Sequence, residues 1–321
     1  MIDPIALRSL VALARNGTVN GAAEMLGYTP SAVSQQLKKL EVSTGVTLVE
    51  RFGRGVVLTA QGRQLVDAAE DLLAQMEHLE SALLASAGTP SGQVRLGSFS
   101  TAVRGVVAPA LARLAGEQPG VRVRLSEVEP WSAVTEVADG RIDLAIVHNW
   151  EPVPLSIPAN LQTRRLGQDR ADILVRADDP LAARASTHAA ELIGRDFVSV
   201  APGSICHAWL SWMFSSVGAI PRIVHTSAEF GSHIALVAAG QASALVPRLG
   251  RGPLPPSVVA VPLTNPAPLR TVTAVWRRTM ETNPGITAVL TVLTDAARAV
   301  LDQSPGPEPD GSPVEEVGSA P

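Results

Sequence analysis

"YTPSAVSQQLKKLE", residues Tyr28–Glu41, is the stretch that decides how the N-terminal part of the chain folds. Thr29 suits a helix N-cap because its hydroxyl can accept an N–H from the first turn. Pro30 then takes the first helical position, where its missing N–H costs nothing. Apolar residues recur at helical spacing and predict a buried stripe, formed by Val33, Leu37 and Leu40.

The other face of this helix carries short hydroxyls, amides and a cation, where a solvated face usually carries paired glutamates and lysines. Such groups can hydrogen-bond to the phosphates and base edges of duplex DNA. We therefore expect DNA to contact the start and the polar face of the helix, through Thr29, Pro30, Ser31, Ser34, Gln35 and Lys38.

The neighbouring segments extend this pattern. Residues 18–27, "TVNGAAEMLG", predict a preceding helix capped by Thr18 and ended by a turn at Gly27, which can take positive φ. Together the two helices form a helix-turn-helix pattern, which an ordinary pair of core helices would also produce.

Residues 47–59, "TLVERFGRGVVLT", predict a β-hairpin with strands at Leu48–Glu50 and Val56–Leu58. Arg54 stands between two glycines at its tip. It is either a plain surface residue or a side chain that reaches into a narrow minor groove. We add Arg51 and Arg54 to the expected DNA-binding residues.

At this point residues 1–62 resemble the winged helix-turn-helix of the LysR-type transcriptional regulators. The resemblance rests on "AAEMLGYTPSAVSQQLKKLE" and on the spacing L-x-E-R-x-x-R-x-V-x-L-T-x-x-G that follows. It continues more loosely to about residue 300, through "GAIPRIVHTSAEFGSHIALVAAGQASALVP". Gln35 stands where many members have Arg, so base readout should differ, with Gln35 favouring adenine.

Residues 60–86 predict one long helix, capped by Thr59. Apolar residues recur in it with a period of 3.5, as in a coiled-coil seam, unless this stripe packs against its own chain. The family resemblance implies an antiparallel dimerisation helix, a near-palindromic operator with half-sites about one helical turn apart, and tetramers formed as dimers of dimers. The expected seam residues are Leu65, Ala69, Leu72, Met76, Leu79 and Leu83.

Beyond residue 92 the chain alternates strand-like and helix-like runs, which predicts an α/β fold with mainly parallel sheets in two subdomains. The resemblance implies an effector domain like a periplasmic binding protein, with crossings near Arg165 and Pro266. The expected parts are a winged helix-turn-helix (1–58), a linker helix (59–87), a hinge (88–92), an effector domain (93–302; subdomain I 93–165 and 267–302, subdomain II 166–266) and a disordered acidic tail (303–321).

Ligands of such folds bind in the cleft at the carboxyl ends of strands. Ser100 and Thr101 should cap a helix there. The free N–H groups at the start of that helix could attract an anion, or the two hydroxyls could serve helix capping alone. Trp131 is as well explained by a core or surface position, and His148 by a hydrogen-bonded bystander. Ser204 and Phe230 are implied by the resemblance. The expected effector-binding residues are Ser100, Thr101, Pro130, Trp131, His148, Asn149, Ser204 and Phe230.

Composition excludes several other functions. The 321 residues include one cysteine, Cys206, so no intramolecular disulfide forms, and a buried apolar thiol is favoured over a redox sensor. The net charge of −4 matches the four acids of the tail, so it does not argue against DNA. Nucleophile-elbow, zinc-protease, P-loop, dinucleotide and C-x-x-C motifs are absent, which argues against an enzyme.

The expected partners are double-stranded DNA, a second copy of the chain, a small-molecule effector and RNA polymerase. We expect no metal and no cofactor. We expect no membrane span, because no apolar run reaches about 18 residues. A solute-binding protein for uptake would share the fold, but the N-terminus carries no secretory signal. The sequence therefore predicts a bacterial, cytoplasmic, nucleoid-associated regulator.

Overall fold

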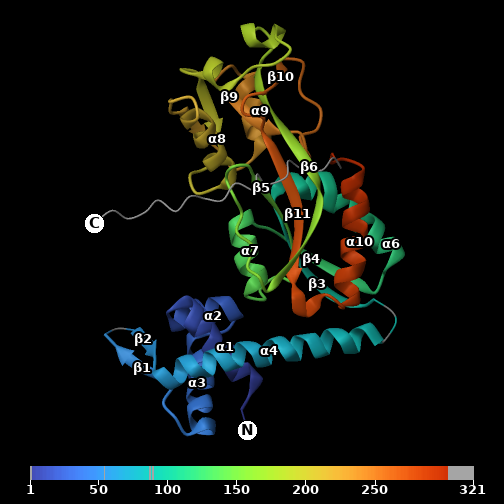
Figure 1. Ribbon diagram of the computed structural model, residues 1–321. Helices are drawn as coiled ribbons and strands as arrows, with labels where there is room; N and C mark the ends of the chain where they lie inside the picture. Colours follow the sequence, from blue (N-terminus) through green and yellow to red (C-terminus); the bar gives the residue numbers. More distant parts are fainter. Residues whose placement is uncertain (1, 54, 87, 89, 303–321) are drawn as a thin grey trace, which may run out of the picture.

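The computed structural model describes residues 2–53, 55–86, 88 and 90–302. Arg54, parts of the expected hinge and the expected disordered tail at 303–321 lie outside the described residues. Figure 1 shows a small N-terminal module of helices and a hairpin, joined by one long helix to a larger body of helices and strands.

The N-terminal module contains three helices that bury one apolar core. They are α1 (Pro4–Asn16), α2 (Val19–Leu26) and α3 (Pro30–Thr44). The predicted caps are confirmed, since the hydroxyls of Thr18 and Thr29 accept N–H groups from α2 and α3 at 3.0 and 3.2 Å. The predicted apolar stripe is also confirmed, because its three residues are at most 4% exposed and pack against α1: Val33, Leu37 and Leu40.

A β-hairpin follows α3, with β1 at Val49–Phe52 and β2 at Gly55–Leu58. The prediction that its first strand covers Leu48–Glu50 is wrong by one residue at the start and two at the end. The reason lies in Leu48, which is buried and whose N–H donates to the Glu41 carboxylate at 2.8 Å. Leu48 therefore joins the hairpin to α3, and the cross-strand pairs run from Val49 to Phe52.

The long helix α4 spans Ala60–Ser86, as predicted, and the Thr59 hydroxyl accepts the Gly62 N–H at 2.9 Å. A Cβ at Gly62 would lie 2.2 Å from the Leu48 carbonyl oxygen. Only glycine therefore allows α4 to start this close to the hairpin.

The larger body is built on one nine-stranded sheet, in the order β4-β3-β5-β11-β6-β9-β7-β8, with β10 paired to β6. The strands are β3 (Gly92–Ser98), β4 (Val121–Glu127), β5 (Leu144–Trp150), β6 (Leu161–Arg176), β7 (Asp196–Ser199), β8 (Arg222–Thr226), β9 (Ser243–Pro247), β10 (Val258–Pro262) and β11 (Leu269–Arg277).

The sheet is mixed, so the prediction of mainly parallel sheets is wrong. β3 pairs in parallel with β4 and β5, and β7 pairs in parallel with β8 and β9. β6 and β11 run antiparallel to each other and to their other neighbours. β6 pairs with β11 up to Arg170 and with β9 and β10 from Ala171 onward, so this single strand connects the two halves.

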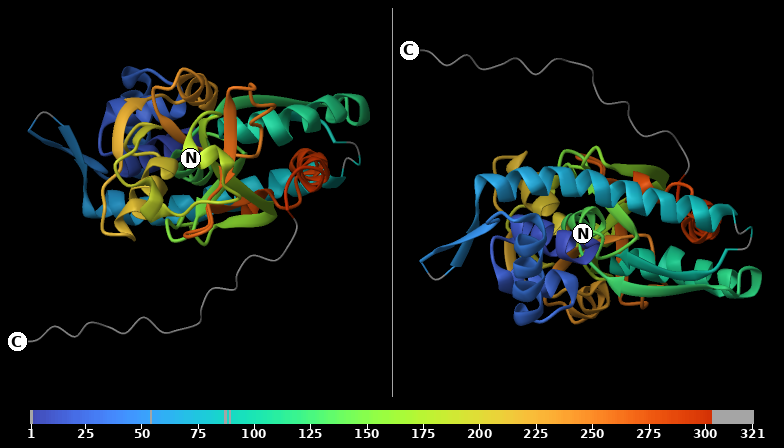
Figure 2. Two further views of the ribbon diagram at one scale, coloured as in Figure 1. Left: turned by 90° about the horizontal axis from the view of Figure 1, so that it is seen from above. Right: turned by 90° about the horizontal axis from the view of Figure 1, so that it is seen from below.

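Helices cover both halves of the sheet (Figures 1 and 2). In the half that contains β3, one face packs against α6 and α10, and the other against α7. In the other half, α8 and α9 lie over two separate apolar clusters. The helices are α5 (Ser100–Ala102), the π-helical η1 (Val103–Val107), α6 (Ala108–Glu117), α7 (Pro130–Ala138), α8 (Ile205–Ser215), α9 (Phe230–Ala238) and α10 (Pro284–Arg298), with short 3-10 turns η2 (Pro180–Ala183), η3 (Ala189–Leu192) and η4 (Arg278–Met280).

One side of α4 packs against its own chain. Glu77 accepts hydrogen bonds from Arg277 at 2.8–3.0 Å and from the Thr279 hydroxyl, and both of these residues belong to the larger body. Burial alone would raise the pKa of Glu77, but the hydrogen bonds and charge of Arg277 outweigh it and lower that pKa. Arg15 of α1 binds Glu70 at 2.8 Å and Asp139 at 2.9 Å. Ion pairs therefore connect the N-terminal module, α4 and the effector domain.

Candidate functional site

The polar face of α3 is free to meet a partner. Ser31, Ser34, Gln35 and Lys38 are all exposed. The Ser34 hydroxyl donates back to the Pro30 carbonyl at 2.9 Å. Within the part of the chain that the structure describes, the side chains of Gln35 and Lys38 make no hydrogen bond or ion pair, whereas the adjacent Lys39 binds Asp3 at 2.7 Å. An amide and an ammonium group are therefore available on this face.

The hairpin adds a second exposed surface beside α3. Arg51 is exposed, and Arg54 lies outside the described residues. Phe52, which sequence reasoning did not single out, is 74% exposed near the tip. The sequence did offer a sign of this exposure, because Phe52 follows Glu50 and Arg51 directly before the turn glycine of a short hairpin.

The predicted seam of α4 divides into two groups. Leu72, Leu79 and Leu83 are 45–61% exposed in the single chain, so they can meet a partner. Ala69, in contrast, is 1% exposed in the core of the N-terminal module, and Leu65 packs against that core. The prediction that these two lie in the seam is therefore corrected, because α1 covers them. Met76 is half-buried.

A buried arginine that the sequence analysis missed lies at the centre of the larger body, where β6 and β11 pair. Arg270 of β11 is 1% exposed and binds Asp169 of β6, with its Nε and Nη2 atoms 2.9 and 2.7 Å from one carboxylate oxygen. Its guanidinium lies 5.0 and 5.5 Å from the ring centres of Phe99 and Trp150. The sequence contained a sign of its burial. Every second residue of β11 points into the core, and Arg270 occupies one of these inward positions.

The expected capping by Ser100 and Thr101 is wrong. The N-cap of α5 is Phe99, which makes no side-chain cap bond. The Thr101 hydroxyl is buried and instead accepts a hydrogen bond from Arg270 at 2.8 Å. Thr101 therefore supports the buried ion pair of Arg270 and Asp169.

His148 lies inside β5, not after it, because β5 continues to Trp150 by pairing with β11. Its ring is 4.5 Å from that of Phe99 at the centroids, edge to face. Burial, and secondarily the charge of Arg270, lowers the pKa of His148 well below its ordinary value. His148 is therefore neutral and part of the packed centre.

The remaining expected residues lie in four places. Pro130 and Trp131 begin α7, with Pro130 buried and Trp131 38% exposed. Asn149 is half-buried in β5. Ser204 caps α8 by accepting the His207 N–H at 3.2 Å, and Phe230 is the first residue of α9.

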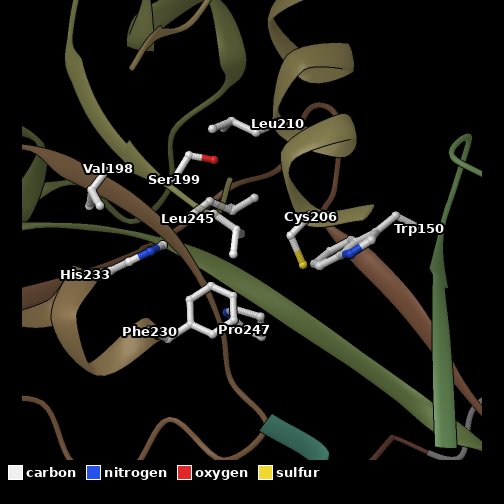
Figure 3. A pocket seen from close by; sticks show the side chains of 10 residues that line it. Trp150, Val198, Ser199, Cys206, Leu210, Phe230, His233, Leu245 and Pro247 are labelled. Carbon is white, nitrogen blue, oxygen red and sulfur yellow. The ribbon is translucent and has the colours of Figure 1, made fainter. Parts of the chain in front are cut away.

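Of the predicted effector residues, Phe230 lines a crevice in the half of the sheet that contains α8 and α9 (Figure 3). The space inside it that can hold the centre of a water molecule is only about 10 Å³. The walls are mostly apolar and contain no charged residue: Trp150, Val198, Ser199, Val200, Cys206, Leu210, Phe230, His233, Leu245 and Pro247.

Family models match both parts of the chain. Residues 5–63 match the bacterial regulatory helix-turn-helix protein of the lysR family, and residues 87–298 match the LysR substrate binding domain. The chain belongs to the LysR family. This LysR-family chain is therefore a bacterial transcriptional regulator with a helix-turn-helix module and a substrate-binding domain.

Individual proteins of known sequence or structure also match this chain. The small neutral protease regulatory protein of Streptomyces coelicolor A3(2) is 33% identical over 73% of this chain and 70% of its own length. A full-length OxyR variant from Pseudomonas aeruginosa has the same fold, with a TM-score of 0.64, 22% identity, and 94% and 99% of the two chains covered. Full-length CbnR in complex with its target DNA has a TM-score of 0.53 and 18% identity over 92% and 99% of the chains.

Among the described residues of this LysR-family regulator, no group of three or more His, Cys, Asp or Glu side chains is placed to hold a metal ion. None of the helices described is long and apolar enough to cross a membrane.

The Cys206 thiol of this regulator should react slowly. Burial, chiefly, raises its pKa from 9.0 to about 11, and the thiolate is the reactive form. A shift of this size lowers the thiolate fraction, and with it the reaction rate at pH 7.5, by about 100-fold relative to the unfolded chain. Reaction with an aromatic disulfide reagent, with and without guanidinium, measures this ratio. Equal rates would contradict the expectation, and a Cys206→Ser protein gives the blank.

Proposed function

We propose that this regulator binds a near-palindromic operator as a dimer or a dimer of dimers, and that a small molecule in the effector domain changes its action. The observation that carries the proposal is the sidedness of α3, whose apolar stripe is buried while Gln35 and Lys38 stay exposed and unpaired among the described residues. The exposed leucines of α4 provide the surface for a second chain.

The DNA contacts follow from the chemistry of α3 and the hairpin. A recognition helix lies in the major groove with its first residues at base edges, and a dimer places two such helices about 34 Å apart or a multiple of it. Gln35 offers an amide that pairs with adenine, and Lys38 offers an ammonium group for a phosphate. Arg51 extends the cationic surface onto the hairpin. CbnR, which shares this fold, has been solved in complex with its target DNA, and this supports DNA as the partner.

Lys38→Ala should reduce the salt dependence of DNA binding more than Lys39→Ala does. Each phosphate contact contributes about 0.9 to the slope of log affinity against log salt, so a dimer that loses two contacts should lose roughly 1.8. Lys39 is the matched control, because its replacement removes the same charge from the same helix but its ammonium binds Asp3. Gel shifts across a salt series would measure both slopes, on a fragment selected from random duplexes.

Two outcomes would count against the proposal. Equal slopes for the two lysine variants would remove Lys38 from the interface. A wild-type protein that selects no palindromic sequence at low salt would remove the regulator function itself.

The same proposal defines the remaining roles. The chain acts without a cofactor and without catalysing a reaction, and its ligands are DNA, its own second copy and a small effector. It works in the bacterial cytoplasm, at the nucleoid, and contacts RNA polymerase from its operator. The family match supports a regulatory role rather than an enzymatic one.

A further inference from the structure

The crevice between α8 and α9 contains two buried polar atoms that lack hydrogen-bond partners in the described structure. Trp150 and His233 are each 1% exposed and line it, and neither Trp150 Nε1 nor His233 Nδ1 has a partner. The Cys206 sulfur lies beside the indole N–H, and this contact lowers the pKa of the thiol. Sulfur is a weak acceptor, however, and Trp150 Nε1 has no partner at hydrogen-bond geometry among the described residues. Buried polar atoms in native proteins usually have partners, so we expect each of these two to hydrogen-bond to a bound molecule.

The roles of the two atoms can be assigned. Indole Nε1 is always a donor. His233 Nε2 lies 2.9 Å from the Ser227 carbonyl oxygen, which only accepts, so Nε2 carries the proton. Burial lowers the pKa of His233 and keeps the ring neutral, which leaves Nδ1 as an acceptor. The crevice therefore offers one donor and one acceptor within apolar walls.

No charged side chain lines the crevice, so an anion there would be buried without a counter-ion. Arg270, whose guanidinium lies 5.5 Å from the centre of the Trp150 ring, is already paired with Asp169 at 2.7 Å. Burial raises the pKa of the Cys206 thiol most; the charge of Arg270 lowers that pKa, and the charges of Glu129 and Asp169 raise it. Burial, followed by the charge of Glu127, raises the pKa of Glu129 itself, as expected where negative charge is unfavourable.

We propose that this crevice binds the uncharged polar end of a small effector that offers both an acceptor, to Trp150 Nε1, and a donor, to His233 Nδ1, as a primary carboxamide does. Figure 3 shows both side chains among the crevice walls. The crevice as it stands admits about one water molecule, so binding moves side chains such as Leu210 or parts the two halves of the domain. This inference rests on the proposed effector response.

Benzamide, benzoate and benzamidine test the proposal, because they share a ring and differ in charge. Calorimetric titration of the full chain at pH 7.5 should show benzamide binding at least about tenfold more tightly than benzoate, since an anion would be buried without a partner. Benzamidine should also bind more weakly, because no carboxylate lines the crevice. This comparison needs no variant.

Trp150→Phe and His233→Phe each remove one of the two polar atoms and should weaken benzamide binding about five- to tenfold. Trp276→Phe is the matched control, because Trp276 is also buried with an unpartnered Nε1 but does not line the crevice. Benzoate or benzamidine binding as well as benzamide, or an equal loss in the Trp276 variant, would overturn the proposal. A complete lack of benzamide binding would also overturn it, because the crevice would then hold only water. Gel shifts on the same preparation separate this failure from a failure of operator binding.

Discussion

Replacing Leu79 by glutamate should convert a dimeric protein into a monomer and weaken operator binding by about 100- to 10,000-fold. Leu79 is 60% exposed at the middle of the α4 seam, between Leu72 and Leu83. In a dimer the new carboxylate would be buried in an apolar contact without a partner. Once the chains separate, each half-site is bound independently, and the gain in effective concentration is lost.

His78→Glu is the matched control for that change. His78 is also exposed on α4 and is the direct neighbour of Leu79, but at about 100° per residue it points away from the seam. Light scattering after gel filtration would give the mass, and gel shifts would give the affinity. If the Leu79 variant stays dimeric, or if both variants lose affinity alike, the exposed leucines of α4 are not the dimer contact.

The N-terminal module could be predicted from the sequence because its determinants are local. Thr18, Thr29 and Thr59 cap helices that begin within three residues of them. The apolar stripe of α3 repeats every three or four residues and needs no distant partner to be recognised. Such short-range features leave few alternative folds for this segment.

The buried centre around Arg270 could not be predicted in the same way, because its contacts join distant residues. Arg270 and Asp169 are 101 positions apart, and both belong to types that are almost never fully buried unless paired. The first half of β6 also escaped notice. Its residues 161–170, "LQTRRLGQDR", show no alternation, and β11 rather than an apolar pattern holds them in the sheet.

The α4 seam lies between these two cases. Its 3.5-residue period is visible in the sequence, but periodicity does not say what covers each position. The N-terminal core covers Ala69, which leaves the seam shorter than the repeat suggests. The contact between Glu77 and Arg277, separated by 200 positions, also fixes one side of α4 in a way that no local pattern predicts.

Arg270→Met should lower the free energy of unfolding by about 3–5 kcal/mol, because it leaves Asp169 buried without its counter-ion. Asp169 is also a buried acceptor for the Leu249 and Arg170 N–H groups at 3.0 and 2.9 Å, so it cannot turn toward water without breaking both bonds. For a domain of this size the melting temperature should fall by roughly 6–20 °C. Thermal unfolding of the full chain, followed by circular dichroism, measures it.

Two further proteins make this expectation specific. Arg113→Met removes a surface arginine that pairs with Glu117 and Asp295, and it should cause only a small fraction of the change. Adding Asp169→Asn to Arg270→Met should restore part of the stability. The amide oxygen can still accept the two N–H groups, while the unpaired buried charge is gone. A single Arg270 variant that melts with the wild type, or a double variant less stable than the single one, would show that this buried ion pair does not stabilise the domain.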